Sequence, residues 1–159
     1  MITVIIKLKN KNIIVSNSCS SIVFWNLDNY NKEKTINDVR PRYPSHMIEL
    51  TDSNIAVSHS DSPYPIIIIE TNNYTIIQKI TVEGYTSNNS SLHLVSSNSF
   101  MYAYSGRIVY FSTTNYNVLF KDNNVGDVDG QYGITTTKNG RYIIITSRSN
   151  GLVIFEQYY

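Results

Sequence analysis

Residues that favour helices are scarce in this sequence. Alanine occurs twice and leucine seven times among 159 residues, whereas isoleucine, valine, tyrosine and threonine are abundant. Side chains of these four types lose rotamer freedom in a helix and fit a pleated sheet. Asparagine and serine, which favour turns, separate the apolar runs. Hydrophobic residues make up 42% of the chain, which argues against disorder. We therefore predict an ordered, all-β protein.

The sequence also lacks disulfide partners, long apolar runs and a strong net charge. Its one cysteine, Cys19, has no second cysteine to pair with, so the fold does not depend on oxidation. No run approaches the ~18 apolar residues of a membrane span, and the N-terminal apolar stretch is too short for a signal peptide. The net charge of +1 predicts neither nucleic acid nor a membrane surface as partner. A reducing, cytoplasmic setting is expected.

Groups that would carry catalysis or bind metal are not found in a recognisable pattern. His46, His59 and His93 lie far apart in the sequence, and none has a second histidine or cysteine at ligand spacing. The sequence has no nucleophile elbow and no phosphate-binding glycine loop. The aspartates between residues 122 and 129 do not follow the spacing of a calcium loop. We expect no catalytic residue, no metal site and no cofactor.

A nine-residue pattern of apolar residues, a polar turn and a tyrosine is repeated along the chain. It occupies residues 22–30, 66–74 and 108–116, and residues 152–159 repeat it without its last position. The fourth apolar position falls on Trp25, Ile69, Phe111 and Phe155, at spacings of 44, 42 and 44 residues. Because Tyr30, Tyr74 and Tyr116 share one position, we expect them to pack the turn rather than bind a ligand.

Each repeat is expected to hold four short strands, which is typical of propeller blades at about 40–45 residues per repeat. The third strands, such as 22–25 and 66–69, are apolar at every position and should be covered on both faces. The fourth strand of the first repeat carries charges at 32–34 and suits an outer edge. A plain sandwich of short strands is the alternative, but it does not explain a repeat at near-constant spacing.

The stretch Ile22–Leu27 resembles the strand-ending Trp-Asp signature of the WD-repeat family, and residues 139–156 are similar to the family's second and third strands. The resemblance covers all four repeats. The aspartate of the signature is replaced each time, tryptophan survives once, and no Gly-His dipeptide occurs. Of the family's Asp-His-Ser-Trp network, Ser16 and Trp25 are the remaining members. The residues that replace the signature aspartate are Asn26, Glu70, Ser112 and Glu156.

The resemblance implies one β-propeller domain over residues 1–159. Its four antiparallel blades would lie at about 1–44, 45–88, 89–127 and 128–159, the last one incomplete. Three alternatives follow for the open array: the last blade stays three-stranded, the chain is part of a larger propeller, or copies assemble as a homo-oligomer that completes a ring. Trp25 is expected in the core, so that Trp25→Ala would lower the free energy of unfolding by roughly 3–5 kcal/mol.

The resemblance also implies a shared face for the loops between blades and the loops between second and third strands. Arginine and tyrosine are over-represented at binding hot spots, and two prolines stiffen the loop at residues 40–44. We predict a partner-binding face at this position; unrelated surface loops are the alternative. Its residues would be Arg40, Arg42, Tyr43, Tyr64, Tyr85, Arg107 and Arg148.

The function implied by the resemblance is that of a non-catalytic protein–protein interaction scaffold. Two alternatives stay open at this point. One is an enzyme with a small-molecule site at the propeller's central channel. The other is a truncated propeller fragment without a separate activity.

Overall fold

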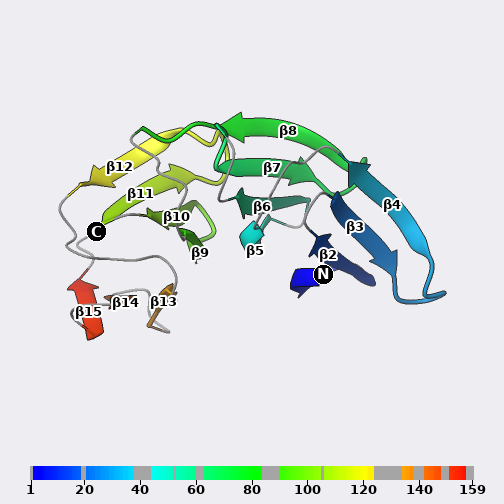
Figure 1. Ribbon diagram of the computed structural model, residues 1–159, viewed down its shortest axis with the longest axis horizontal. Helices are drawn as coiled ribbons and strands as arrows, with labels where there is room; N and C mark the ends of the chain where they lie inside the picture. The colour runs from blue at the N-terminus through cyan, green and yellow to red at the C-terminus, as the bar shows by residue number, and fades with distance from the viewer. Residues whose placement is uncertain are drawn as a thin grey trace. The chain divides into compact units, whose positions relative to one another are not determined.

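The structure is a computed structural model in which every described regular element is a β-strand (Figure 1). The strands form separate antiparallel sheets, each made of consecutive strands in chain order. This confirms the predicted all-β class. The described residues are 2–18, 21–37, 44–51, 53–59, 63–83, 90–104, 106–123, 134–137, 142–147 and 151–156.

The first two sheets have four strands each, in the orders β1-β2-β3-β4 and β5-β6-β7-β8. The first is made of β1 (Ile2–Lys7), β2 (Ile13–Ser18), β3 (Ser21–Asn26) and β4 (Lys32–Asn37). The second is made of β5 (Pro44–Thr51), β6 (Asn54–His59), β7 (Ile66–Glu70) and β8 (Thr75–Ile80).

The third sheet has four strands and the fourth has three in the described part of the chain. The third is made of β9 (Ser90–Ser96), β10 (Ser99–Tyr104), β11 (Arg107–Ser112) and β12 (Val118–Asp122). The fourth is made of β13 (Ile134–Thr136), β14 (Tyr142–Ser147) and β15 (Gly151–Glu156).

The three four-stranded sheets share one irregularity in register. A bulge interrupts the pairing of the third with the fourth strand after Phe24, after Ile68 and after Tyr110. These residues hold the third apolar position of the nine-residue pattern, so the repeat in sequence is also a repeat in structure. A bulge at this point increases the local twist of the outer strand.

The chain divides into two compact units, Met1–Ser87 and Asn88–Tyr159. Each unit holds two of the four sheets, and the division falls next to the expected limit between the second and third repeats. The grouping of all four sheets into one domain stays a prediction.

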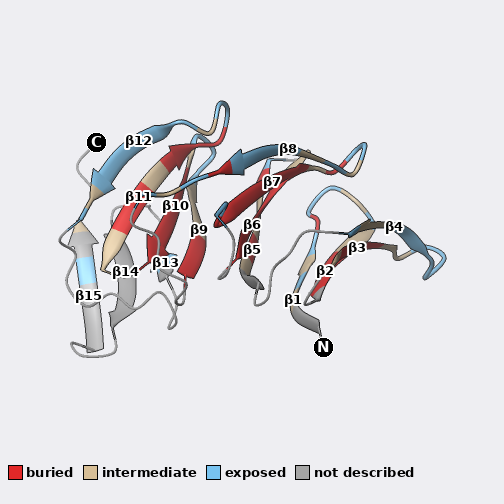
Figure 2. Cartoon of the chain, turned by 45° about the horizontal axis from the view of Figure 1, so that its top comes forward, coloured by how far each residue is buried: buried red, intermediate tan, exposed pale blue. Residues whose placement is uncertain are grey.

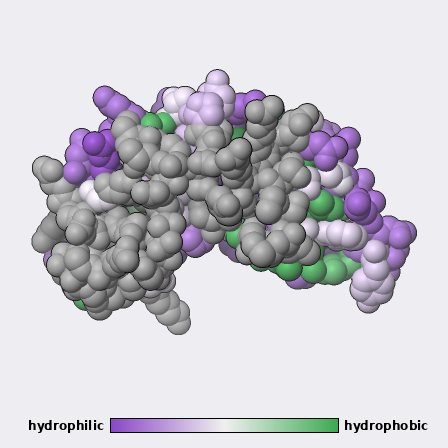
Figure 3. Space-filling model, viewed as in Figure 1, coloured by the Kyte–Doolittle hydropathy of each residue, from purple (hydrophilic) through white to green (hydrophobic). Residues whose placement is uncertain are grey.

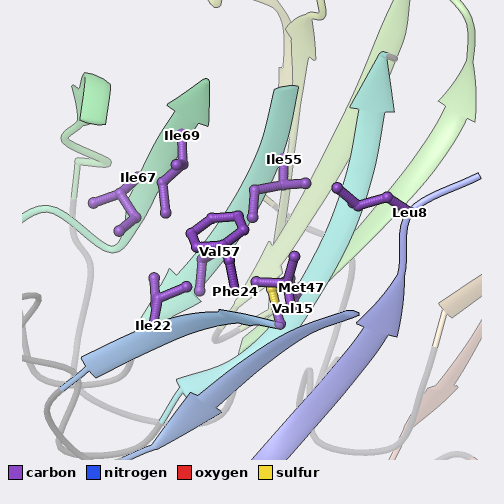
Figure 4. Packing of buried hydrophobic residues seen from close by; sticks show 9 residues of the cluster. All are labelled: Leu8, Val15, Ile22, Phe24, Met47, Ile55, Val57, Ile67 and Ile69. Carbon is purple, nitrogen blue, oxygen red and sulfur yellow. The ribbon is translucent and has the colours of Figure 1, made fainter. Parts of the chain in front are cut away.

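The core of the first unit lies between its two sheets (Figure 4). Each sheet contributes alternate apolar side chains from one face, as the two-residue period of a strand requires. Full burial stabilises an aliphatic or phenylalanine side chain by about 1.5–3 kcal/mol. The buried residues are Leu8, Val15, Ile22 and Phe24 from the first sheet and Met47, Ile55, Val57, Ile67 and Ile69 from the second.

The third strands differ in how far they are covered (Figure 2). In β7 the four isoleucines 66–69 are all buried, which confirms that both faces are covered. In β3 only Ile22 and Phe24 are buried, while Val23 and Trp25 are partly exposed. The prediction that both faces are covered is therefore wrong for β3. Among the described residues the second sheet covers one face of the first, and Trp25 lies on the other.

The outer strands β4, β8 and β12 are largely exposed (Figure 2). Lys32, Glu33 and Lys34 face solvent on β4, as expected for an edge protected by charge. On β12, by contrast, apolar Leu119 and Phe120 are exposed.

We predict that Phe24→Ala destabilises the chain more than Trp25→Ala. The first change leaves a cavity in the core and should lower the free energy of unfolding by roughly 3–5 kcal/mol. The second removes a partly exposed ring and one hydrogen bond, a loss of about 1–3 kcal/mol. Urea denaturation of both variants measures the difference. Equal losses, or a larger loss for Trp25→Ala, would contradict this account of the core.

Candidate functional site

Two residues of the predicted partner-binding face lie among the described residues, Tyr64 in the first unit and Arg107 in the second. The remaining five lie outside the described residues: Arg40, Arg42, Tyr43, Tyr85 and Arg148.

Tyr64 lies in the segment just before β7, with 39% of its surface exposed. The ammonium group of Lys79, on β8, lies 5.6 Å from the centre of its ring. A cation at this distance is attracted by the ring, by about 0.5–1 kcal/mol at an exposed site. Tyr64 thus presents an aromatic surface with a positive charge beside it.

Buried groups lie on both sides of the loop that contains Tyr64, residues 60–64. The backbone N–H of His59 donates a hydrogen bond of 2.8 Å to the carbonyl of Pro65, which ties both ends of the loop together. His59 itself is 1% exposed, and burial lowers its pKa to about 4, so the imidazole is neutral at pH 7. Next to it, the buried Ser58 hydroxyl accepts a 3.0 Å hydrogen bond from the His46 backbone N–H.

Arg107 begins β11 and is partly exposed. It lies opposite Tyr104 across the strand pair, directly after Gly106. Gly106 has φ 73°, a left-handed conformation that glycine adopts without a steric penalty. Tyr104 is buried, and its ring stacks on Tyr102 at 5.2 Å, so the strand that pairs with Arg107 is packed at this end.

At the other end of the third strands, three of the residues that replace the signature aspartate share one role. Asn26 Oδ1 accepts a 2.7 Å hydrogen bond from the backbone N–H of Asp28. The Glu70 carboxylate accepts from the N–H groups of residues 72 and 73, at 2.9 and 2.8 Å. Ser112 Oγ accepts from the N–H groups of residues 114 and 115, at 3.1 and 3.4 Å. Three chemically different side chains therefore stabilise the same turn.

Each of these turns ends at a tyrosine in the left-handed conformation. The φ angles are 59° for Tyr30, 56° for Tyr74 and 60° for Tyr116. Positive φ is unfavourable for a residue with a bulky side chain and persists where the surroundings fix it. The shared backbone conformation is consistent with a structural role for the position. The prediction that the side chains pack the turn is wrong for Tyr30, which is 81% exposed, whereas Tyr74 and Tyr116 are partly buried.

Tyr74, in this left-handed conformation, connects the second sheet to the first. Its ring packs on Phe24 with 4.8 Å between ring centres, and its hydroxyl donates a hydrogen bond to Glu33 Oε2. Asn26 Nδ2 donates to the other oxygen of Glu33, at 2.6 Å. The bonds from Tyr74 and Asn26 lower the pKa of Glu33. Burial and the neighbouring Glu33 raise the pKa of Tyr74 to about 12.

The predicted remnant of the family's polar network is present in the first sheet. Trp25 Nε1 donates a 2.9 Å hydrogen bond to Ser16 Oγ. The Lys32 ammonium group lies 5.7 Å from the centre of the Trp25 ring. Within the described residues there is no cluster of three or more histidine, cysteine, aspartate or glutamate side chains that could hold a metal ion. A search of the same residues finds no helix with the length and apolar character of a membrane span.

No protein-family model matches the chain, and no curated protein matches it in sequence. Among solved structures, it is similar to the crystal structure of the WD40 β-propeller domain of Doa1, with a TM-score of 0.78 and 14% sequence identity. The match covers 99% of this chain and 51% of that one. The fold is that of WD40 propeller blades. The resemblance seen in sequence is thereby confirmed for the fold. The four sheets are called the first to fourth blades below.

Sequence reasoning missed two features of this region. Lys79 gave no signal, because its place over Tyr64 depends on the register of β8 and not on a motif. The buried state of His59 was signalled only indirectly, by its position two residues after the apolar run Ile55–Val57.

We predict that His59 makes the chain sensitive to mild acid. Its pKa of about 4 in the folded chain lies below the ordinary 6.5, so the unfolded chain binds the extra proton. Stability is then full above pH 6.5 and is lost as the pH falls toward 4, by up to about 3 kcal/mol. Chemical denaturation at a series of pH values measures this loss.

The matched variant is His59→Leu, which should unfold with a much smaller acid-side loss. His93, whose pKa burial also lowers, is present in both proteins, so the difference between them isolates His59. Identical pH profiles would show that His59 is not the group responsible.

Proposed function

We propose that this chain is a non-catalytic interaction scaffold that binds a partner protein through the loops between its blades and between second and third strands. The support is the WD40 fold, which is typically a protein-interaction module. Because one fold hosts many functions, the residues of the loops must carry the rest of the proposal.

The observation that favours the loops is the exposed Tyr64 on a fixed base. Its ring is accessible, and the backbone of the neighbouring Pro65 accepts a hydrogen bond from the His59 N–H. A side chain that is already positioned loses little conformational entropy on binding. Tyrosine is also enriched at binding hot spots.

Charge on the proposed face points to the chemistry of the partner. The face combines arginines with tyrosines, and Lys79 adds a cation beside Tyr64. Arginine binds carboxylates through two parallel hydrogen bonds. We therefore propose a partner protein that presents aspartate or glutamate side chains, in a cytoplasmic setting consistent with the single cysteine.

The experiment is capture of proteins by the immobilised chain, identification by mass spectrometry and measurement of the dissociation constant with the purified partner. The double variant Arg40→Glu/Arg42→Glu and the single variant Tyr64→Ala should each weaken binding at least tenfold, the effect of losing about 1.4 kcal/mol.

The matched control is Lys34→Glu, a charge reversal on the exposed outer strand β4, which should leave the dissociation constant unchanged. If the loop variants bind as tightly as the wild type, the proposed face is wrong. A partner lost equally in the control would show that net charge, and not the loops, controls capture.

A further inference from the structure

The first two blades carry a matching set of residues on one face. In the first blade Ile14 pairs with Trp25 across the strands, and in the second Ile55 pairs with Ile69 at the same positions of the repeat. We call this set the leading face of a blade. In the first blade it comprises Ile5, Ile14, Ser16, Val23, Trp25, Tyr30 and Lys32, which match Met47, Ile55, Val57, Ile67, Ile69, Tyr74 and Ile76 of the second blade.

The leading face of the second blade is an interface within the first unit. Met47, Ile55, Val57, Ile67 and Ile69 are at most 5% exposed, and they belong to the core that this blade shares with the first. We call the opposite face of the first blade its trailing face. It supplies the other half of this core through Leu8, Val15, Ile22 and Phe24, and Phe24 packs on Tyr74.

The leading face of the first blade keeps this apolar character but is exposed. Ile5 is 57% and Tyr30 is 81% exposed, and Ile14, Val23 and Trp25 are partly exposed. Hydrophobic side chains are visible over the first blade in Figure 3.

Lys7 and Thr35 pair with Ile14 and Val23 and so add polar side chains to this face. Within the matching set itself two positions are polar, and both are suited to burial. Ser16 replaces the Val57 of the second blade, but its hydroxyl already has a partner in Trp25. A buried polar group with a partner carries little penalty. Lys32 replaces Ile76 and lies over the Trp25 ring, so its stem can cover apolar surface while the ammonium group reaches water.

The fourth blade shows a complementary feature. Ile154 occupies the position of Phe24: it directly precedes the fourth apolar residue of the pattern, and it lies opposite Ile144 as Phe24 lies opposite Val15. Phe24 is fully buried against the next blade, whereas Ile154 is 56% exposed. The fourth blade thus presents a branched apolar side chain where an inter-blade contact is made elsewhere in the chain.

We propose that the leading face of the first blade binds the trailing face of the fourth blade of a second copy of this chain, with Ile154 against Tyr30 as Phe24 lies against Tyr74. A second copy is the occupant because one chain carries both halves of the contact. This proposal rests on the fold and not on the proposed partner-binding loops.

A contact between two different faces is heterologous, so it either closes into a ring or continues into a filament. Light scattering on a sizing column distinguishes these forms from a monomer of 18.1 kDa. A closed pair of chains is expected. The variants Tyr30→Asp and Ile154→Lys should each reduce the mass to that of the monomer. Both positions are more than half exposed in the single chain, so the fold should persist, as circular dichroism will show.

Mixing the two variants gives the most specific test. In a mixed pair one contact has the wild-type Tyr30 and Ile154, and the other joins the introduced aspartate to the introduced lysine. The mixture should therefore recover the pair that neither variant forms alone. The matched control is Ile77→Lys on β8, a residue 45% exposed outside both faces, and it should leave the mass unchanged.

A wild-type monomer at tens of micromolar would overturn the proposal, as would a pair whose mass neither variant reduces. Larger assemblies that dissolve in both variants would support the contact as one that continues into a filament. Failure of the partner-capture experiment leaves this test unaffected, because none of its variants lies in the proposed loops.

Discussion

The fold of this chain depends on the burial of one blade's face against the next, shown most clearly where the Phe24 ring lies on Tyr74. A single blade of short strands cannot bury both of its faces, so its stability comes from its neighbours. In the first unit this burial combines nine apolar side chains with polar connections between the two blades. The Tyr74 hydroxyl donates to Glu33, the Lys9 backbone N–H donates to the Glu49 carboxylate, and the Lys11 ammonium group donates to Thr71 and Asn72. The left-handed φ of the tyrosine places the ring at the interface, and the turn before it is stabilised by a side-chain acceptor.

This dependence explains how the fold persists with a degenerate signature. The position after the fourth apolar residue needs an acceptor for backbone N–H groups, and Asn26, Glu70 and Ser112 all provide one. The interface between the first two blades needs apolar volume, which phenylalanine, isoleucine, valine, leucine and methionine side chains supply. Sequence identity can therefore fall to 14% against a WD40 domain while the TM-score remains 0.78.

The sequence was sufficient to predict the strands, because a two-residue period and polar turns recur at constant spacing. It was misleading for Trp25, which the pattern assigns to the core. The equivalent residue of the second blade, Ile69, is buried against the first blade, whereas Trp25 is partly exposed. The repeat pattern alone does not distinguish these two surroundings. Of the candidate loops, the resemblance suggested a binding face that includes Tyr64, which is 39% exposed. It could not predict the cation beside Tyr64, since Lys79 reaches the ring only through the register of β8 against β7.

The central claim is that the Phe24–Tyr74 contact helps to hold the first two blades, which are separate sheets, against each other. A double-mutant cycle on this pair tests it most directly, with the free energies of unfolding measured for the wild type, Phe24→Leu, Tyr74→Leu and the double variant. An aromatic pair in contact should show a coupling energy of about 0.5–1.5 kcal/mol, so the double variant should lose less stability than the sum of the two single losses. Additive losses would contradict the claim, because they would mean that the two rings do not touch in solution.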